Sequence, residues 1–286
     1  MQDLEMTGER LVTSFNNHYG KFEHLHRYAL ASEFVEDKIV LDIACGEGYG
    51  TNLLSHKSKM IYGVDISNEA VTHAQEKYIN RSINFKLGSA TQIPFENDFF
   101  DVVTSFETIE HLVEHEKMFS EIKRVLKKDG VLILSSPEKN IYSERDPNNI
   151  YHVKELTLEE LLKLITINFK NNIILKQLIS IGSLIIPIEE VTSKFKTYCG
   201  NYYELKESFD EFDFFNKPFF NLVICSDSEL NLTNKSLVSI YDSYEVYKSI
   251  LQEKDKTIDN LQMKIQKINS NKVYNILKRI KRLLGL

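Results

Sequence analysis

The chain has 286 residues, which is enough for one domain of the usual size plus an appendage. Its hydrophobic content of 42% and charged content of 27% exclude wholesale disorder. The cysteines at positions 45, 199 and 225 are odd in number and scattered, which excludes a disulfide framework and a paired-cysteine metal site. No apolar run reaches the ~20 residues of a membrane-spanning helix, and the first residues lack a secretory h-region, so we expect a cytoplasmic protein.

The net charge of −6 is unevenly distributed. Residues 261–286 carry seven bases and no acid: Lys264, Lys267, Lys272, Lys278, Arg279, Lys281 and Arg282. The remainder has 28 bases and 41 acids, a charge of −13. An acidic body is a poor partner for a phosphate backbone, so we expect no nucleic-acid partner. We expect the basic C-terminal segment to have a function separate from that of the body.

An N-terminal helical cap is predicted over residues 1–37. Its sequence includes GER at 8–10 and EHLHRY at 23–28. A cation in this segment could close over an anionic group of a ligand, and Arg27 is the first choice. A solvated amphipathic helix is the alternative.

Short β-rich runs alternate with amphipathic helical patterns over the next part of the chain. The predicted strands are 38–43, 60–66, 83–87, 100–106 and 131–136, and the predicted helices lie near 50–56, 68–78, 114–127 and 155–166. Two further runs, 172–180 and 219–226, could complete the sheet. The alternation predicts an α/β protein with a Rossmann-like, doubly wound, mostly parallel sheet over 38–230, interrupted by an irregular aromatic-rich insertion at about 181–217.

A glycine-rich loop follows the first predicted strand in VLDIACGEGYG, residues 40–50. Gly46 and Gly48 lack a Cβ, so the chain can turn sharply and a ligand can approach the backbone closely. Asp42 ends the strand and can accept hydrogen bonds from an ammonium group. Asp65 ends the next strand, where a carboxylate meets ribose hydroxyls in doubly wound folds. A tight turn and a helix N-cap are the structural alternatives for these residues. We expect Cys45 to be a small packing residue rather than a nucleophile.

These motifs resemble those of class I S-adenosylmethionine (SAM)-dependent methyltransferases. The resemblance covers about residues 38–180 and rests on DIACGEGYG, GVDIS, GSATQIPF, FDVVTSFETIEHL and IKRVLKKDGVLILSSP, in that order. It implies that the loop from Asp42 to Gly48 holds the methionine end of SAM and that Asp65 binds the ribose. It further implies that Ser89 and Ala90 flank the adenine. Other implied cofactor contacts are Ala44, Ile66 and Phe106. Many members have an acid where Ser89 stands, so the adenine amino group would need another partner here.

A second constellation, Glu107-Thr-Ile-Glu110-His111, directly follows the strand at 100–106. In one interpretation, His111 or Glu107 is a general base that accepts the proton of an acceptor hydroxyl. In another, Glu107, Glu110 and His111, with His152 as a distant fourth ligand, hold a divalent metal. The E-x-x-E-H pattern is similar to that of small-RNA 2′-O-methyltransferases and of ubiquinone-pathway O-methyltransferases, where it is associated with a divalent cation. Helix capping and pairing with lysines is the structural alternative. We expect His115, farther along, to lie on a solvated face.

The acceptor predicted from the sequence is a sugar hydroxyl or a phosphate on a surface glycan or its precursor. The GER and HLHRY stretches, YHVKEL and KPFFNLVICS together look like methyltransferases that accompany bacterial surface-polysaccharide biosynthesis. Aromatic residues of the insertion suit stacking on sugars, although a core role fits them equally: Tyr198, Tyr202, Tyr203, Phe212, Phe214 and Phe215. The alternatives are a quinone-like small molecule, an RNA 3′ end, or a non-catalytic SAM-binding coiled-coil scaffold.

The C-terminal region predicts a coiled coil over 240–270 and a basic amphipathic helix over 272–286. The seam repeats every seven residues: Tyr244, Leu251, Ile258 and Ile265, followed at three residues by Tyr247, Lys254, Leu261 and Ile268. Such a seam favours a homo-oligomer. The last segment has an apolar face and a basic face, which is typical of a helix lying on an anionic membrane surface. We therefore expect a peripheral position at the inner face of the cell membrane. Packing onto the acidic body is the alternative.

Overall fold

The computed structural model describes residues 20–145, 149–178, 199–200, 205–206, 219–231, 243–270 and 272–284. The chain divides into two compact units, the body, mainly Phe22–Ser239, and the tail, mainly Ile240–Leu286. The GER stretch and the aromatic residues of the predicted insertion lie outside the described residues.

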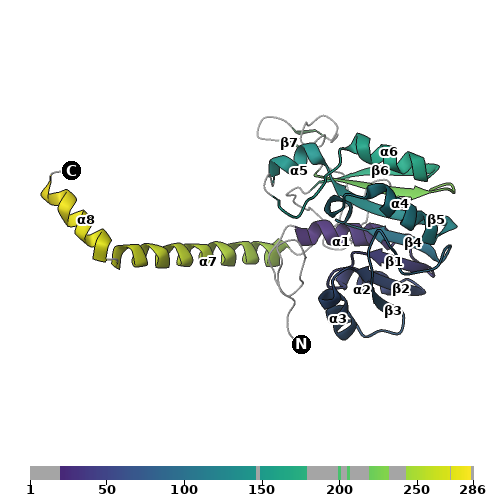
Figure 1. Cartoon of the computed structure of the whole chain (residues 1–286), viewed down its shortest axis with the longest axis horizontal. Coiled ribbons are helices and arrows are strands. Elements are labelled where there is room, and N and C mark those ends of the chain that lie inside the picture. Colours follow the sequence, from purple (N-terminus) through teal and green to yellow (C-terminus); the bar gives the residue numbers. More distant parts are fainter. Residues whose placement is uncertain are drawn as a thin grey trace. The chain divides into compact units, whose positions relative to one another are not determined.

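A seven-stranded sheet forms the centre of the body (Figure 1). In chain order its strands are β1 (Ile39–Ile43), β2 (Met60–Asp65), β3 (Ile83–Leu87), β4 (Phe100–Ser105), β5 (Leu126–Pro137), β6 (Asn171–Gln177) and β9 (Phe220–Ser226). Their order in space is β3-β2-β1-β4-β5-β9-β6, and β9 runs antiparallel to both of its neighbours. The other pairings are parallel. The prediction of a mostly parallel sheet completed by two late strands is confirmed.

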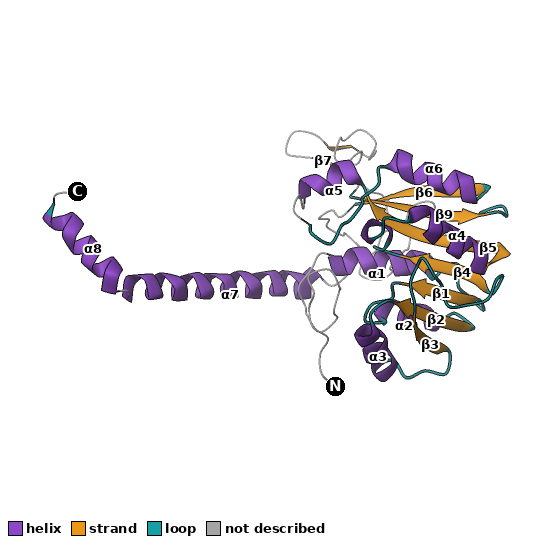
Figure 2. Ribbon diagram, viewed as in Figure 1, coloured by secondary structure: helices purple, strands orange, loops and turns teal. Residues whose placement is uncertain are grey.

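Helices cover both faces of this sheet (Figure 2). The helices of the body are α1 (Gly20–Ala31), α2 (Tyr49–Ser55), α3 (Asn68–Lys77), α4 (His115–Val125), α5 (Lys139–Arg145) and α6 (Leu158–Asn168), with a short 3₁₀ turn, η1 (Ile109–His111). Successive strand residues point to opposite faces, so Val40 of β1 packs with α1, α2 and α3, whereas Leu41 packs with α4 and α6. These two apolar layers explain why the strands are nearly continuous apolar runs.

Local sequence signals set where the helices begin. Thr157 precedes α6, and its hydroxyl accepts the backbone N–H of Glu160 while the Glu160 carboxylate accepts that of Thr157. Ser67 caps α3 by accepting the N–H of Ala70. A small two-stranded sheet, β7 (Cys199–Gly200) and β8 (Leu205–Lys206), lies within the predicted insertion.

The strand order places a ligand site at one edge of the sheet. After β1 the chain adds β2 and β3 on one side, whereas β4 and β5 lie on the other. Open α/β sheets bind ligands beyond the carboxyl ends of their strands at such a switch point. The register pairs Ile43 of β1 with Ser105 of β4. The glycine-rich loop and the Glu107 constellation therefore leave the sheet side by side.

The tail contains two helices, α7 (Ser243–Ser270) and α8 (Lys272–Leu283). They lie within residues 240–270 and 272–286, where a coiled coil and a basic amphipathic helix are predicted. Pairing of α7 with another chain stays a prediction. Among the described residues, no helix is long and apolar enough to cross a membrane.

Candidate active site

The loop between β1 and α2 adopts a backbone that favours glycine. Ala44, Gly46 and Gly48 have positive φ angles of 56°, 55° and 88°. A Cβ on Gly48 would lie 2.8 Å from the Phe85 ring and 2.9 Å from the Ala74 Cβ, so a side chain there is excluded by space as well as by conformation. At the non-glycine Ala44, a left-handed backbone costs energy, which is typical of functional sites. The loop is therefore a tightly fitted backbone surface.

Asp65, the predicted ribose ligand, fastens this loop to the end of β2. Its Oδ2 accepts the N–H of Gly46 at 2.9 Å, and its Oδ1 accepts the N–H of Ser67 at 2.8 Å. Each oxygen keeps a further lone pair with which to accept a ribose hydroxyl. Because Ser67 provides the side-chain cap of α3, the N-cap alternative for Asp65 is wrong.

Asp42, predicted to hold the methionine end of the cofactor, lies beneath the loop. It is fully buried, and its carboxylate accepts the hydroxyls of Thr51 at 2.7 Å, Thr104 at 2.8 Å and Tyr28 at 3.3 Å. Burial raises the pKa of Asp42 to about 6, although the three hydroxyls oppose this shift. Asp42 thus ties α1, β1, α2 and β4 together under the loop.

The residues predicted to surround the adenine and the transferred methyl line the neighbouring strand ends. Ile66, just after β2, exposes 78% of its surface, which leaves an apolar side chain free to cover a ligand. Ala90 is buried, and the Ser89 hydroxyl is 3.0 Å from that of Thr91. Phe106, buried at the end of β4, packs edge-to-face on Tyr28 with ring centroids 5.0 Å apart.

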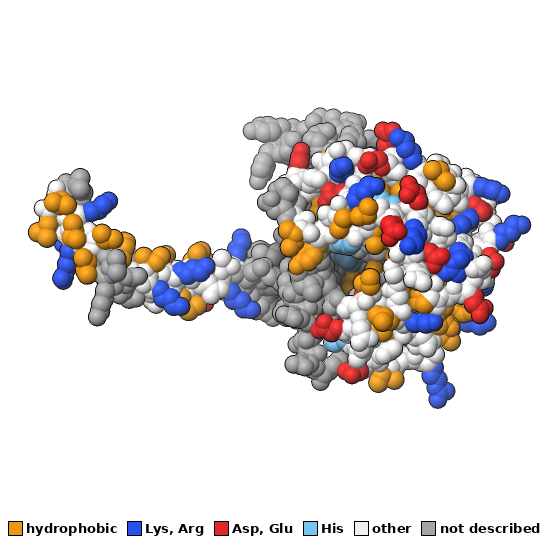
Figure 3. Space-filling view, in the orientation of Figure 1, with side chains coloured by type: hydrophobic (Ala, Val, Ile, Leu, Met, Phe, Trp, Pro, Cys, Tyr) orange, Lys and Arg blue, Asp and Glu red, His pale blue; other side chains and the backbone are white. Residues whose placement is uncertain are grey.

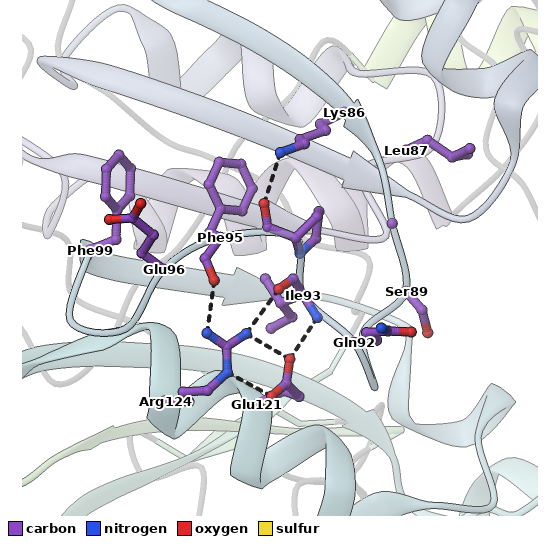
Figure 4. A pocket seen from close by; sticks show the side chains of 12 residues that line it. Lys86, Leu87, Ser89, Gln92, Ile93, Phe95, Glu96, Phe99, Glu121 and Arg124 are labelled. Carbon is purple, nitrogen blue, oxygen red and sulfur yellow. Dashed lines mark hydrogen bonds and ion pairs between the residues drawn. The ribbon is translucent and has the colours of Figure 1, made fainter.

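A cavity of about 900 Å³ opens next to Ser89, on the side of the loop after β3 (Figure 4). Arg124 of α4 lies at its wall, where it donates to Glu121 at 2.7 Å and to the backbone carbonyls of Ile93 and Phe95 at 2.9 and 2.7 Å. The cavity includes neither the glycine loop nor Glu107 nor His111. We therefore assign Arg124 to holding the 93–97 loop rather than to catalysis.

Arg27, predicted to reach the cofactor, is buried beside Glu107. Its Nη1 lies 3.0 Å from the Glu107 carboxylate, its Nε donates to Gln177 at 2.8 Å, and its guanidinium carbon lies 4.2 Å from the centre of the Phe220 ring. Glu107 also accepts the Ser135 hydroxyl at 2.8 Å. The Nη2 of Arg27 is buried and makes no hydrogen bond within the described part of the chain. The N–H groups of Nη2 therefore remain available to an anionic ligand group.

Three of the four predicted metal ligands come together. One ligand atom each from Glu110, His111 and His152 lies within 4.8 Å of the others. The backbone brings this about, because the Glu110 carbonyl accepts the N–H groups of Val153 at 2.9 Å and Lys154 at 3.0 Å. Glu107 is not in this group and instead contacts Arg27 and Ser135. The structure thus separates Glu107 from the cluster in which the sequence analysis placed it.

Hydrogen bonds orient both imidazoles. The Nδ1 of His111 lies 3.0 Å from the carbonyl oxygen of Tyr151, and the Nδ1 of His152 lies 2.6 Å from the Glu155 carboxylate. Both partners are acceptors, so each Nδ1 carries a proton. In the neutral form of such a ring, with the proton on Nδ1, Nε2 carries the lone pair that can ligate a metal ion. Metal-ligating histidines usually have such partners on the other ring nitrogen.

Two minor expectations have different outcomes. His115, predicted to lie on a solvated face, is only 3% exposed, and burial together with nearby Lys154 lowers its pKa. That prediction is wrong, because His115 opens α4 on the side that packs against the sheet. Cys45 is buried, and burial raises the pKa of its thiol, which agrees with the predicted packing role rather than with a nucleophile.

Several site residues carry no sequence signal of their own. Tyr28, Thr51 and Thr104, which bind Asp42, are ordinary residues of two helices and a strand. Gln177, which holds Arg27, lies 150 residues from it in the chain. Lys77 of α3, which is partly exposed, forms an ion pair with the buried Glu47 of the glycine loop. Only the strand order, known from the structure, brings these partners together.

The fold and site have the features of the class I methyltransferase fold: a mostly parallel sheet with an antiparallel β9, a glycine loop after β1 and an acidic residue ending β2. Residues 41–134 match the protein family described as "Methyltransferase domain". The chain is 32% identical over 165 residues to a "Probable S-adenosylmethionine-dependent methyltransferase" of Mycolicibacterium smegmatis, covering 57% of this chain and 63% of that protein. These matches support the predicted class I SAM-dependent methyltransferase domain.

Two more distant relatives extend the comparison. A "Ubiquinone biosynthesis O-methyltransferase" of Coxiella burnetii is 26% identical over 141 residues, covering 46% of this chain and 59% of that protein. The solved structure of a SAM-dependent methyltransferase from Thermotoga maritima has 20% identity and a TM-score of 0.52, covering 73% of this chain and 90% of that one. The latter likeness concerns the fold alone. The chain thus spans less than two thirds of the length of these curated relatives.

Proposed function

We propose that this protein is an enzyme that transfers a methyl group from SAM to an oxygen of its acceptor. One observation carries the proposal: the pairing of β1 with β4 places the glycine loop beside Phe106 and Glu107, and the Glu110–His111–His152 cluster follows directly. A cofactor site and a group able to handle a hydroxyl proton therefore share the same edge of the sheet.

The cofactor would lie on the loop between β1 and α2. The backbone at Gly46 and Gly48 can approach its methionine part, Asp65 would accept the ribose hydroxyls, and the Nη2 of Arg27 would donate to the carboxylate. When bound, SAM supplies a methyl group on a positively charged sulfur. Glu107 and buried Asp42 place negative charge near that cation, which favours its binding.

The proton of the acceptor hydroxyl needs a base or a cation. In a direct mechanism, Nε2 of His111 would accept the proton of the acceptor hydroxyl, whose oxygen would take the methyl group while the electron pair of the carbon–sulfur bond would remain on sulfur. The Glu107 carboxylate is already engaged by Arg27 and by the Ser135 hydroxyl, so it is the less suitable base. Of the two residues predicted as the general base, His111 is therefore the one we propose.

The same residues also suit a divalent cation. Glu110, His111 and His152 would hold it through one carboxylate oxygen and two Nε2 atoms, and the cation would polarise the acceptor hydroxyl. His111 has one free lone pair, so it can ligate a cation or accept a proton, but not both. The Nδ1 partners of both histidines favour the metal, which is our first choice.

For the acceptor, we propose a sugar hydroxyl or a phosphate on a surface glycan or its precursor. The resemblance of YHVKEL and KPFFNLVICS to glycan-associated methyltransferases supports this choice. A quinone-like small molecule is the second candidate, and the similarity to the ubiquinone-pathway O-methyltransferase favours it. An RNA 3′ end suits the acidic body poorly.

The test is turnover of methyl-labelled SAM with a panel of glycan precursors, catechols and RNA. We expect transfer to a glycan precursor, whereas transfer to a catechol alone would establish the second candidate. A chain that binds SAM and methylates none of them, with or without divalent cations, would favour the non-catalytic scaffold. If His111 takes part, His111→Ala should lose this turnover. His56→Ala, which changes an exposed surface histidine, is the control and should keep it.

A further inference from the structure

Helix α8 divides its side chains sharply between two faces. At 100° per residue, six apolar side chains fall within an arc of about 120°. These are Val273, Ile276, Leu277, Ile280, Leu283 and Leu284. Five bases occupy the rest of the circumference: Lys272, Lys278, Arg279, Lys281 and Arg282. Figure 3 shows apolar and basic side chains together at the surface of this segment.

The apolar face is open to solvent in the single chain. Ile276, Leu277 and Ile280 expose between 44% and 57% of their surface, and Leu283 exposes 86%. A contiguous apolar stripe of this kind is unfavourable in water and marks an interaction surface. A cover for α8 must therefore come from outside the helix.

The charge pattern selects the kind of cover. Residues 261–286 contain no acid, so a second α8 packed on the first would bring two sets of five bases together. An acidic protein surface would match the basic face but offer nothing to the apolar one. An anionic leaflet matches both, because its phosphates lie above apolar acyl chains. The helix is about 18 Å long, too short to cross a hydrocarbon core of about 30 Å.

We infer that α8 binds an anionic lipid surface, with its apolar face between the acyl chains and its bases on the phosphates. The helix lies along the surface and holds the chain there. The inference concerns binding alone, so it stands or falls independently of the methyltransferase proposal.

The experiment is co-sedimentation of the full chain with phosphatidylcholine vesicles, with and without phosphatidylglycerol. We expect binding to the anionic vesicles at low salt, weaker binding as salt increases, and no binding by a chain ending at Ser270.

Lys278→Gln and Lys281→Gln should each weaken binding about fivefold. Ile276→Ser with Ile280→Ser should weaken it at least about tenfold. Asn275→Ser, on the basic face, is the matched control and should bind like the unchanged chain.

Two outcomes would overturn the inference. One is equal sedimentation of the full and shortened chains, provided that both unfold at the same temperature. The other is hydrogen exchange of residues 272–284 that is slow before vesicles are added and unchanged afterwards, which would mean that protein already covers α8.

Discussion

The body buries charged side chains, whereas the tail exposes apolar ones. In the body, Arg27, Asp42 and Glu110 are buried charged residues at the carboxyl edge of the sheet. In the tail, apolar residues such as Ile258 and Ile280 face solvent. Burying a charge is costly unless partners stabilise it, so the contacts of these residues within the body account for its site. An exposed apolar stripe lacks such contacts, so the role of the tail depends on what covers the stripe.

The largest expected effect tests whether the buried Glu110 acts with its histidine neighbours. We expect Glu110→Ala, or a chelator added to the unchanged chain, to reduce turnover by roughly 10²–10⁴-fold while SAM still binds, because the acceptor hydroxyl is no longer polarised. Turnover and calorimetric SAM affinity are measured on the same samples. Glu114→Ala is the control, because Glu114 is an exposed acid three residues after His111.

Full activity in chelator would remove the metal and leave His111 as the base. In that case His111→Ala should show the same loss and Glu110→Ala a smaller one. Activity retained by both variants would contradict either role for the cluster.

The next prediction concerns the tail's other apolar surface, the seam of α7. Ile258, Leu261, Ile265 and Ile268 each expose about half of their surface, at the spacing of a coiled coil. We expect a homo-oligomer, and Ile258→Ser with Ile265→Ser should raise its dissociation constant at least about 10²-fold through lost apolar burial. Sedimentation equilibrium measures this change.

Met263 provides the matched control for the seam. It is equally exposed but lies on the side of α7 away from the seam, so Met263→Ser should leave the oligomer intact. A monomeric unchanged chain, or equal effects of the two changes, would contradict the coiled coil.

The sequence predicted the elements of the body well because its signals are local. Apolar runs give the strands, and the chemistry of Gly46, Gly48 and Asp65 requires neighbours close in the chain. The cluster of Glu110 and His111 with His152 was also predictable as a pattern. What could not be predicted is pairing across the sheet: Arg27 with Glu107 and Gln177, or Thr104 with Asp42. These contacts depend on strand order and on the insertion of β9 between β5 and β6, which no local pattern encodes.

A third prediction tests the cost of burying Asp42. The folded chain releases this proton near pH 6 and the unfolded chain near the usual value of 3.8, so folding takes up a proton between these values. Stability should therefore rise as the pH falls through this window, opposite to the usual behaviour of a paired carboxylate. Relative to Asp42→Asn, the gain should be about 3 kcal/mol at most. Denaturant unfolding of both chains at several pH values measures it, and a difference that is constant with pH would contradict the raised pKa.

The smallest predicted effect concerns Asp65, where the site meets its cofactor. Asp65→Ala removes the acceptor of the Gly46 N–H, the acceptor of the Ser67 N–H and the proposed ribose ligand. We expect SAM affinity to fall by about 1–3 kcal/mol, the cost of leaving such groups without a charged acceptor. The fold should survive because the residue ends a strand outside the two apolar layers. Glu69→Ala, an exposed acid in the first turn of α3, separates loss of this carboxylate from a general change in charge near the site. Calorimetry on the folded protein measures the SAM affinity. An unchanged affinity in Asp65→Ala would mean that the ribose binds elsewhere and that Asp65 only holds the loop.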